Sequence, residues 1–273
     1  MNEKRVVNAK VVGEKSNIWN KIFLALVLVC IGAAGMYGII KLNPGTTIVN
    51  KLEKEVTVNE NGIADAVEKV YDSVAVVENY RSNKLQATGT GFIFKKEGNK
   101  YYVMTNYHVI ENSSKVKIVL TDNANTEVEV VGGDKYADIA VLSFTSSSDL
   151  KVAEIGSSTD GRVGDTTFAV GAPLDSSTYS WTVTRGILSG KDRMVAVSTT
   201  NSTSSDYIMR VLQTDAAINS GNSGGPLCNS NGQVIGVTNM KLVSSGVEGM
   251  GFAIPIEDAI DFATKIINGD DIT

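Results

Sequence analysis

Short apolar runs recur through the chain after about residue 70, each four to eight residues long and separated by polar or glycine-containing turns. A spacing near ten residues, with 26 glycines in the chain, is typical of strands in an all-β barrel or sandwich. The pattern predicts ten strands, at Val74–Val77, Gly91–Phe94, Tyr101–Thr105, Val116–Leu120, Val128–Val131, Ile139–Phe144, Thr167–Val170, Thr182–Ser189, Ile208–Gln213 and Val234–Thr238.

Two segments in the same region follow the helical period instead. Apolar residues in Ile63–Val70 recur at helical spacing, which indicates a short helix before the first strand. Pro255–Ile267 has the same spacing and predicts a closing helix. The polar tract Ser198–Ser205 has no such pattern and is expected to be a loop.

The N-terminal region contains one long apolar segment, Ile22–Ile40, which has 19 residues without a charge between Lys21 and Lys41. As a helix it would be roughly 28 Å long, close to the hydrocarbon thickness of a bilayer. A buried core helix fits poorly, because apolar residues cover every face. A cleaved signal peptide is the stronger alternative, although its apolar region is usually shorter. We expect an uncleaved transmembrane anchor.

Charge predicts how this anchor is oriented. Residues 1–21 carry five bases and two acids, a balance of +3, whereas the whole chain has a net charge of −5. Basic residues before a span favour a cytoplasmic N-terminus. We therefore expect a single-pass protein of the cell membrane, with its lipid contact at Ile22–Ile40 and everything after Lys41 outside the cell.

Composition excludes several classes of function. The acidic excess after residue 21 is unlike the clustered basic surface that a nucleic-acid-binding protein needs. The chain has one histidine, two cysteines and no Cys-x-x-Cys pair, so no metal site is predicted. Cys30 lies in the apolar segment and Cys228 in the last third, and no disulfide is expected between them.

The segment Asn219–Leu227 (NSGNSGGPL) is the most informative part of the sequence. A nucleophilic serine needs a tight turn that exposes its Oγ and directs backbone N–H groups at a developing oxyanion, and glycine permits such a backbone. A plain Gly/Asn/Ser hairpin turn is the alternative. The string GNSGGPL followed by an apolar strand favours Ser223 as a nucleophile.

A nucleophilic serine needs a general base, and an imidazole base needs an acceptor that fixes its tautomer. His108 is the only histidine, so it is the one possible imidazole base, and it is expected at the end of an apolar strand. Asp138 enters an apolar strand in ADIAVLSF, where a buried carboxylate should be hydrogen-bonded. Asp134 competes for this role, but beside Gly132 and Gly133 it is predicted to be a turn residue.

Together these segments resemble the HtrA/Deg family of serine proteases. The resemblance rests on GTGFIF, TNYHVI, DIAVL, VLQTDAAINSGNSGGPL and GMGFAIPI, which occur in the family order between about Ile63 and Asn268. It implies a chymotrypsin-like, all-β fold of two six-stranded antiparallel barrels with a C-terminal helix. The order His108, Asp138, Ser223 along the chain is also the chymotrypsin order.

The resemblance also implies the roles of individual residues. His108, Asp138 and Ser223 would form the catalytic triad, and the N–H groups of Gly221 and Ser223 would form the oxyanion hole. Substrate would contact a group of residues around the serine and on the following strand, namely Ala217, Ile218, Asn219, Asn222, Thr238 and Met240. The pocket is expected to be neutral, since Ala216–Gly225 carries no charge.

The family hydrolyses peptide bonds in unfolded or exposed protein segments without a metal or nucleotide. We therefore expect no cofactor, a role in extracytoplasmic protein quality control, and assembly into homotrimers. Three departures stand out: Tyr107 replaces the usual Asn, the loop Arg81–Thr88 before GTGF is short, and no PDZ domain is expected after Thr273.

The expected organisation has five parts. They are a cytoplasmic tail at 1–21, an anchor at 22–40, a linker at 41–61, a protease domain at 62–268 with barrels at about 72–150 and 151–254, and a tail at 269–273. Three rival functions are an inactive homologue that only binds, an esterase that uses the same triad, and a structural membrane protein. All triad members and oxyanion glycines are present, and Ser223 precedes a strand instead of the helix expected of an esterase elbow.

Overall fold

The computed structural model describes residues 18–42, 62–171, 181–197, 207–239 and 249–270, except for the side chains of Ile18 and of residues 33–42. The chain divides into two units, Met1–Val58 and Asn59–Thr273. Several predicted features lie outside the described residues: the tail before residue 18, the linker from residue 43, the tract Ser198–Ser205 and the last three residues.

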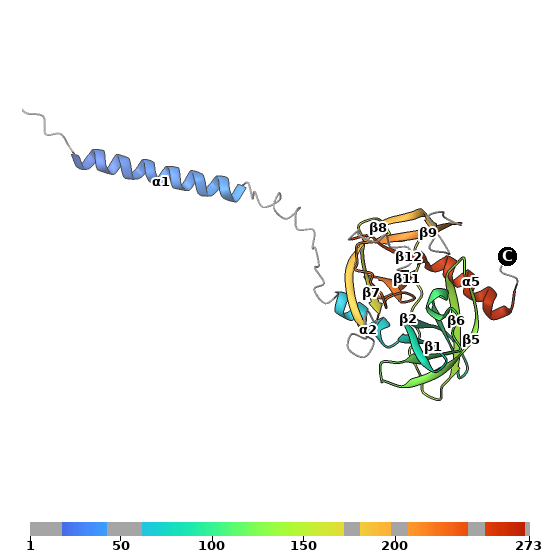
Figure 1. Cartoon of the computed structure of the whole chain (residues 1–273). Coiled ribbons are helices and arrows are strands. Elements are labelled where there is room, and N and C mark those ends of the chain that lie inside the picture. The colour runs from blue at the N-terminus through green and yellow to red at the C-terminus, as the bar shows by residue number, and fades with distance from the viewer. Residues whose placement is uncertain (1–17, 43–61, 172–180, 198–206, 240–248, 271–273) are drawn as a thin grey trace, which may run out of the picture. The chain divides into compact units, whose positions relative to one another are not determined.

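The described part of the first unit is helix α1, which runs from Ile18 to Leu42 (blue in Figure 1). It includes the whole apolar segment Ile22–Ile40. Within the described part of the chain, no helix combines the length and the hydropathy needed to cross a membrane.

The second unit begins with helix α2 (Gly62–Tyr71) and a closed six-stranded barrel. The strands of this first barrel are β1 (Val74–Arg81), β2 (Lys84–Glu97), β3 (Lys100–Thr105), β4 (Lys115–Val119), β5 (Asn125–Asp134) and β6 (Ile139–Thr145). They pair in the order β1-β2-β3-β6-β5-β4, and all of the pairs are antiparallel.

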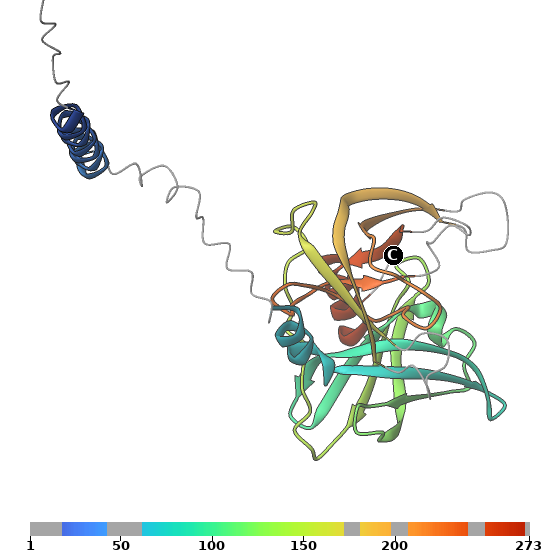
Figure 2. The same ribbon diagram turned by 90° about the vertical axis from the view of Figure 1, so that its left-hand side faces the viewer.

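The second barrel follows and is also closed and antiparallel. Its strands are β7 (Thr166–Gly171), β8 (Thr182–Val197), β9 (Tyr207–Thr214), β10 (Pro226–Asn229), β11 (Val234–Thr238) and β12 (Gly251–Pro255). They pair in the order β10-β11-β12-β9-β8-β7, and the barrels lie side by side in both views (Figures 1 and 2). The predicted fold of two six-stranded barrels and a C-terminal helix is confirmed.

Alternation along the strands explains how the two barrels pack. Successive side chains of a strand point to opposite faces. On β6, Ala140 and Leu142 face the core of the first barrel, whereas Ile139 and Val141 join a core shared by both barrels. On β7, Ala169 faces the inside of the second barrel. Both faces of such strands are therefore buried, and the strands appear in the sequence as continuous apolar runs.

Two helices extend the shared core. Ala66 and Val70 of α2 lie in it, and Lys69 donates from Nζ to the carbonyl of Asn231 in the β10–β11 turn (3.2 Å). Helix α5 (Ile256–Asn268) contributes buried residues such as Ala259 and lies beside β5 and β6 of the first barrel (Figure 1). Helix α5 also contacts β11 and β12, so it bridges the two barrels.

The structure corrects four predictions about elements. Strands β10 and β12 are absent from the predicted set, because β10 has only four residues and β12 has only three residues between its first, glycine, and its last, proline. Strand β8 continues to Val197 instead of ending near Ser189, since bulges at Leu188/Gly190 and Gly190/Arg193 carry polar residues within the strand. The segment Arg81–Thr88 is mostly strand, with a tight turn at Ser82 and Asn83.

Candidate active site

His108 lies just after strand β3, on the short helix α3 (Tyr107–Ile110). The sequence predicted the end of a strand at this position. Instead, Thr105 ends the strand and Asn106, still extended at φ −81° and ψ 148°, precedes the helical turn. The turn places the His108 side chain at the edge of the first barrel, where it is 25% exposed.

Asp138 lies in the turn before β6, in a left-handed conformation with φ +52°. Its side chain is 1% exposed, and its Oδ2 lies 2.7 Å from His108 Nδ1. Its Oδ1 accepts a hydrogen bond from the backbone N–H of His108 (2.9 Å). Two contacts therefore join this buried carboxylate to one residue, His108.

Asn239 is a partner of Asp138 that the sequence reasoning missed. Its Nδ2 donates to Asp138 Oδ2 over 2.8 Å, although the two residues are 101 positions apart. Asn106 supplies a further bond, from its Nδ2 to the backbone carbonyl of Asp138 (2.8 Å). Asn239 directly follows the predicted site residue Thr238, but nothing in the sequence pairs it with Asp138. The bond forms because the second barrel carries β11 to the first.

These contacts define the hydrogen-bonding state of the imidazole. An ionised carboxylate only accepts hydrogen bonds, so Nδ1 of His108 must carry the hydrogen in its bond to Asp138. In the neutral ring Nε2 is then the unprotonated nitrogen and can accept a proton. The pair therefore has the geometry of an oriented general base.

Ser223 lies in a tight loop before β10, and glycines on both sides of it have positive φ values. Gly221 has φ +102° and Gly224 has φ +84°. A Cβ at Gly224 would also collide with Thr105 Oγ1 and Thr90 O. Both the conformation and the space at Gly224 thus require glycine, as the sequence pattern predicted for a nucleophile loop.

The Ser223 loop packs against the chain segment that bears His108. A Cβ at Gly224 would lie 2.8 Å from the backbone N of Asn106. A Cβ at Gly89 would lie 2.7 Å from both Val109 methyl groups and 3.1 Å from the carbonyl of Ser223. The structure therefore brings the loop of Ser223 to the residues on either side of His108.

Asp134, the competing acid, lies at the end of β5. Its Oδ1 accepts a short hydrogen bond from the N–H of Ala137 (2.5 Å), which closes the β5–β6 turn. A bond of this kind is typical of a turn residue, as the sequence predicted for Asp134. The carboxylate that bonds to His108 is that of Asp138.

The predicted substrate-binding residues fall into three groups. Ala217 and Asn219 are exposed. The side chains of Ile218, Asn222 and Thr238 are buried and support the loop, with Thr238 Oγ1 donating to Asn222 O (2.6 Å). Met240 lies outside the described residues. Contact with substrate stays a prediction for all six residues.

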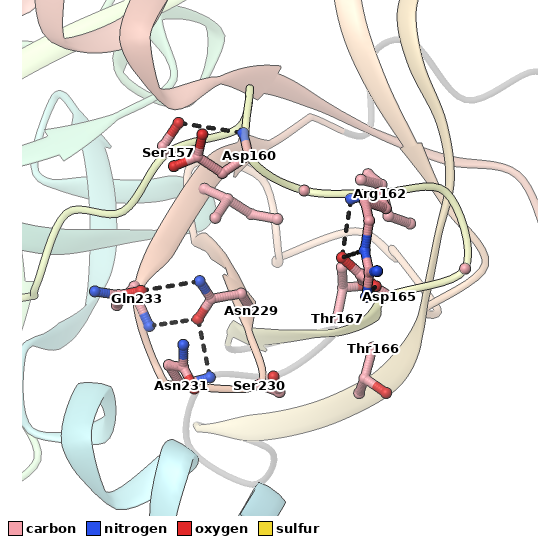
Figure 3. Close-up of a pocket in the computed structure, with 14 residues that line it drawn as sticks. Ser157, Asp160, Arg162, Asp165, Thr166, Thr167, Asn229, Ser230, Asn231 and Gln233 are labelled. Atoms are coloured by element: carbon pink, nitrogen blue, oxygen red, sulfur yellow. Dashed lines mark hydrogen bonds and ion pairs between the residues drawn. The ribbon is translucent and has the colours of Figure 1, made fainter.

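A separate cavity of about 610 Å³ lies on the second barrel (Figure 3). Four of its polar side chains bond in pairs: Arg162 pairs with Asp165 (3.1 Å), and Asn229 with Gln233 (3.1 Å). It contains neither His108 nor Ser223. Its lining residues include no histidine, so the cavity lacks the imidazole base that the His108 site has.

Two comparisons by sequence place this fold and site among known proteins. The family model described as "Trypsin-like peptidase domain" matches residues 89–237. The serine protease Do-like HtrA of Bacillus subtilis (strain 168) is 45% identical over 181 residues, which are 66% of this chain and 39% of that protein. The serine protease Do-like HtrB of the same strain is 40% identical over 223 residues, 77% of this chain and 48% of that protein.

Solved structures give the same result. A serine endoprotease from Yersinia pestis superposes with a TM-score of 0.63 at 32% identity, over 76% of this chain and 66% of that one. The HtrA-type protease AlgW, solved with a tripeptide, gives a TM-score of 0.64 at 32% identity, over 75% of this chain and 63% of that one. The chain spans about half the length of the curated relatives that it matches.

Proposed function

Because this chain belongs to the trypsin-like peptidase family, among its HtrA-type serine proteases, we propose that it is a serine endopeptidase that uses His108, Asp138 and Ser223. The observation that carries this proposal is the buried Asp138 carboxylate bonded to His108 Nδ1 at 2.7 Å. The proposal is further supported by the Ser223 loop, which belongs to the other barrel and packs against Asn106, close in the chain to His108.

The proposed reaction follows from these contacts. The Ser223 hydroxyl attacks the carbonyl carbon of the scissile peptide bond, and His108 Nε2 takes its proton. Asp138 stays ionised and stabilises the imidazolium through Nδ1. His108 then gives the proton to the leaving amine, and the substrate remains as an ester on Ser223. Water, deprotonated by the same imidazole, hydrolyses this acyl-enzyme and restores Ser223.

The negative charge on the carbonyl oxygen needs donors in the transition state. We assign this role to the backbone N–H groups of Gly221 and Ser223, which flank Asn222 in the tight loop. The uncharged stretch Ala216–Gly225 favours small or medium aliphatic side chains on the substrate. One methylene in such a pocket changes selectivity by only about 1–3 kcal/mol.

Hydrolysis of casein by the purified full chain tests this proposal. We expect Ser223→Ala and His108→Ala each to lower kcat by about 10⁴–10⁶, and the double variant to be scarcely slower than either one. Circular dichroism should show that each variant is folded. Proteolysis that survives both substitutions in pure protein would refute the assignment.

The same proposal extends to location. We propose that Ile22–Ile40 of α1 anchors the chain in the cell membrane and that the protease domain lies outside the cell, on the basis of the uncharged segment and the basic residues before it. The full chain should then stay with membranes during carbonate extraction. A mature N-terminus near Gly35 would instead identify a cleaved signal peptide.

The substrates and assembly are proposals of the same kind. An unfolded or exposed segment can adopt the extended conformation that a cleft between two barrels would accept, which is consistent with a role in extracytoplasmic protein quality control. Homotrimers are proposed from the family resemblance alone. Casein, which lacks a stable fold, should be cleaved much faster than a folded globular protein, and light scattering of the purified chain would give the mass of the assembly.

A further inference from the structure

Thr90 of strand β2 is a fully buried residue that joins the first barrel to the Ser223 loop. Its Oγ1 donates to the carbonyl of Gly221 over 2.6 Å. Its backbone N–H donates to the carbonyl of Ser223 over 2.9 Å. One residue of the first barrel thus bonds to both ends of the three-residue segment Gly221–Ser223, 131 positions away.

The backbone of the segment Gly221–Ser223 depends on such contacts, because steric repulsion restricts its conformation only weakly. Gly221 has φ +102°, and a glycine there can rotate into several conformations of similar energy. The peptide plane between Gly221 and Asn222 is held from both sides, since Thr90 Oγ1 bonds to its oxygen and Asn222 N donates to Asn219 O (3.0 Å). The orientation of this plane therefore depends on the Thr90 hydroxyl.

The plane lies between the two N–H groups proposed as oxyanion donors, those of Gly221 and Ser223. Rotation of the plane would change the angle between these donors, and oxyanion stabilisation depends on donors being held in place beforehand. The next plane is held by the second barrel, where Thr238 Oγ1 donates to Asn222 O (2.6 Å). Each barrel thus contributes one hydroxyl to the backbone between the two donors.

The bond network of Thr90 also extends toward the general base. Thr105 Oγ1 donates to the carbonyl of Thr90 over 2.7 Å, and Thr105 is three residues before His108. Thr90 therefore lies between the segment that carries the base and the segment that carries the nucleophile.

We propose that Thr90 is a positioning residue whose hydroxyl orients the oxyanion donors of Gly221 and Ser223 through the Gly221 carbonyl. This inference rests on the proposed protease function. The competing explanation is that Thr90 only adds stability to the contact between the barrels. The two explanations differ in whether loss of the hydroxyl changes the rate of folded enzyme.

The test compares Thr90→Val, which keeps the branched shape and the backbone N–H but loses the hydroxyl, with Thr90→Ser, which keeps the hydroxyl. We expect Thr90→Val to lower kcat of the folded full chain by about 10–100-fold, less than the roughly 10²–10³-fold loss of a whole oxyanion donor, with KM changed less than twofold. Thr90→Ser should stay within about threefold of the parent. Affinity for a peptide boronic acid, whose tetrahedral adduct places an oxygen in the hole, should fall in parallel with kcat.

Thr167→Val is the matched control. Thr167 is also buried, and its Oγ1 bonds to Thr214 Oγ1 over 2.9 Å between two strands of the second barrel, with no bond to Gly221 or Ser223 among those described. This variant should lose stability without loss of kcat. Unfolding curves for each variant show the fraction of molecules that is folded. If Thr90→Val does not fold, Thr90→Ala takes its place and is assayed below its melting temperature.

Two results would overturn the proposal: an unchanged kcat in folded Thr90→Val, or equal losses in Thr90→Val and Thr90→Ser. Either result leaves the protease assignment intact. By contrast, activity retained by Ser223→Ala would refute the protease assignment itself, so the two failures are distinguishable.

Discussion

The Asp138 carboxylate is held by three hydrogen bonds, and the reason is its burial. A carboxylate removed from water loses hydration energy unless hydrogen bonds replace it. The donors are the ring and backbone nitrogens of His108 and the Asn239 amide, at 2.7, 2.9 and 2.8 Å. Because two of these donors come from one residue, the bonds that satisfy the acid also orient the imidazole.

The Asn239 contact leads to a prediction at this scale. Asn239→Leu should lower kcat by about tenfold, because the carboxylate that orients His108 loses one donor. The free energy of unfolding should also fall, by about 1–3 kcal/mol, since a buried acceptor loses a bond. Steady-state kinetics and urea unfolding measure the two effects.

Asn229→Leu serves as the control for this variant. Asn229 donates to Gln233 on the wall of the second-barrel cavity (3.1 Å), far in the chain from Asp138. The Asn229→Leu variant should have a lower free energy of unfolding and an unchanged kcat. An unchanged kcat in folded Asn239→Leu would show that the amide has no part in orienting the base.

Helix α5 shows how one element is fixed to its neighbours by its first turn. Glu257 accepts hydrogen bonds from Ser158 N (2.8 Å) and Ser158 Oγ (2.5 Å), and it lies at the helix N-terminus, where negative charge is favoured. Burial alone would raise the pKa of the Glu257 carboxyl. The hydrogen bonds from Ser158, Ser157 and its own backbone N–H outweigh this effect, so the pKa is lowered.

A pH dependence of stability follows from this lowered pKa. Above the ordinary pKa of a glutamate, about 4.3, the ionised Glu257 stabilises the folded chain, and this contribution is lost as the pH falls through the lower folded-state pKa. Glu257→Gln should therefore be less stable than the parent at pH 7, and the difference should shrink as the pH falls below about 4.

Urea unfolding of both proteins between pH 7 and pH 3 measures this difference. Asp261→Asn provides a control on the same helix, since Asp261 pairs only at the surface with Lys265 (2.8 Å). If the difference in the free energy of unfolding between Glu257→Gln and the parent stayed constant down to pH 3, ionisation of Glu257 would not stabilise α5.

At the scale of the whole molecule, the site depends on how the barrels pack. His108 and Asp138 belong to the first barrel, and Ser223 and Asn239 to the second. The shared core between them is buried and apolar, with residues of both barrels and of helices α2 and α5. Apolar burial is not directional, but close packing gives this interface one preferred geometry.

Two isoleucines on adjacent strands test that dependence. Ile254 of β12 lies in the shared core, and Ile235 of β11 lies inside the second barrel. Each change to alanine should lower the free energy of unfolding by about 2–5 kcal/mol. Only Ile254→Ala should also lower kcat per folded molecule, because it loosens the packing that aligns the barrels. Equal kcat values in the two folded variants, as measured by active-site titration, would contradict this view.

Local patterns were enough to predict an all-β barrel or sandwich and to select the candidate residues, whereas the expectation of two six-stranded barrels came from the family resemblance. Alternating and continuous apolar runs indicated strands such as β3 and β6, because each strand buries its faces in a local sequence of side chains. The only histidine and the glycines around Ser223 restricted the chemistry, since few residues can act as base or nucleophile. Elements with weak local signals, such as the four-residue strand β10, were missed.

Only the tertiary structure decided which distant groups meet. Asn239 bonds to Asp138 across 101 positions, and Thr90 to Gly221 across 131, and neither pair has a spacing or a motif that marks it in the sequence. The short helix that carries His108 was likewise predicted as strand, because its contacts with Asp138 form only when β6 pairs with β3. A short stretch of sequence sets the conformational preference of its own segment, whereas these bonds between distant residues form only when the two barrels close and pack together.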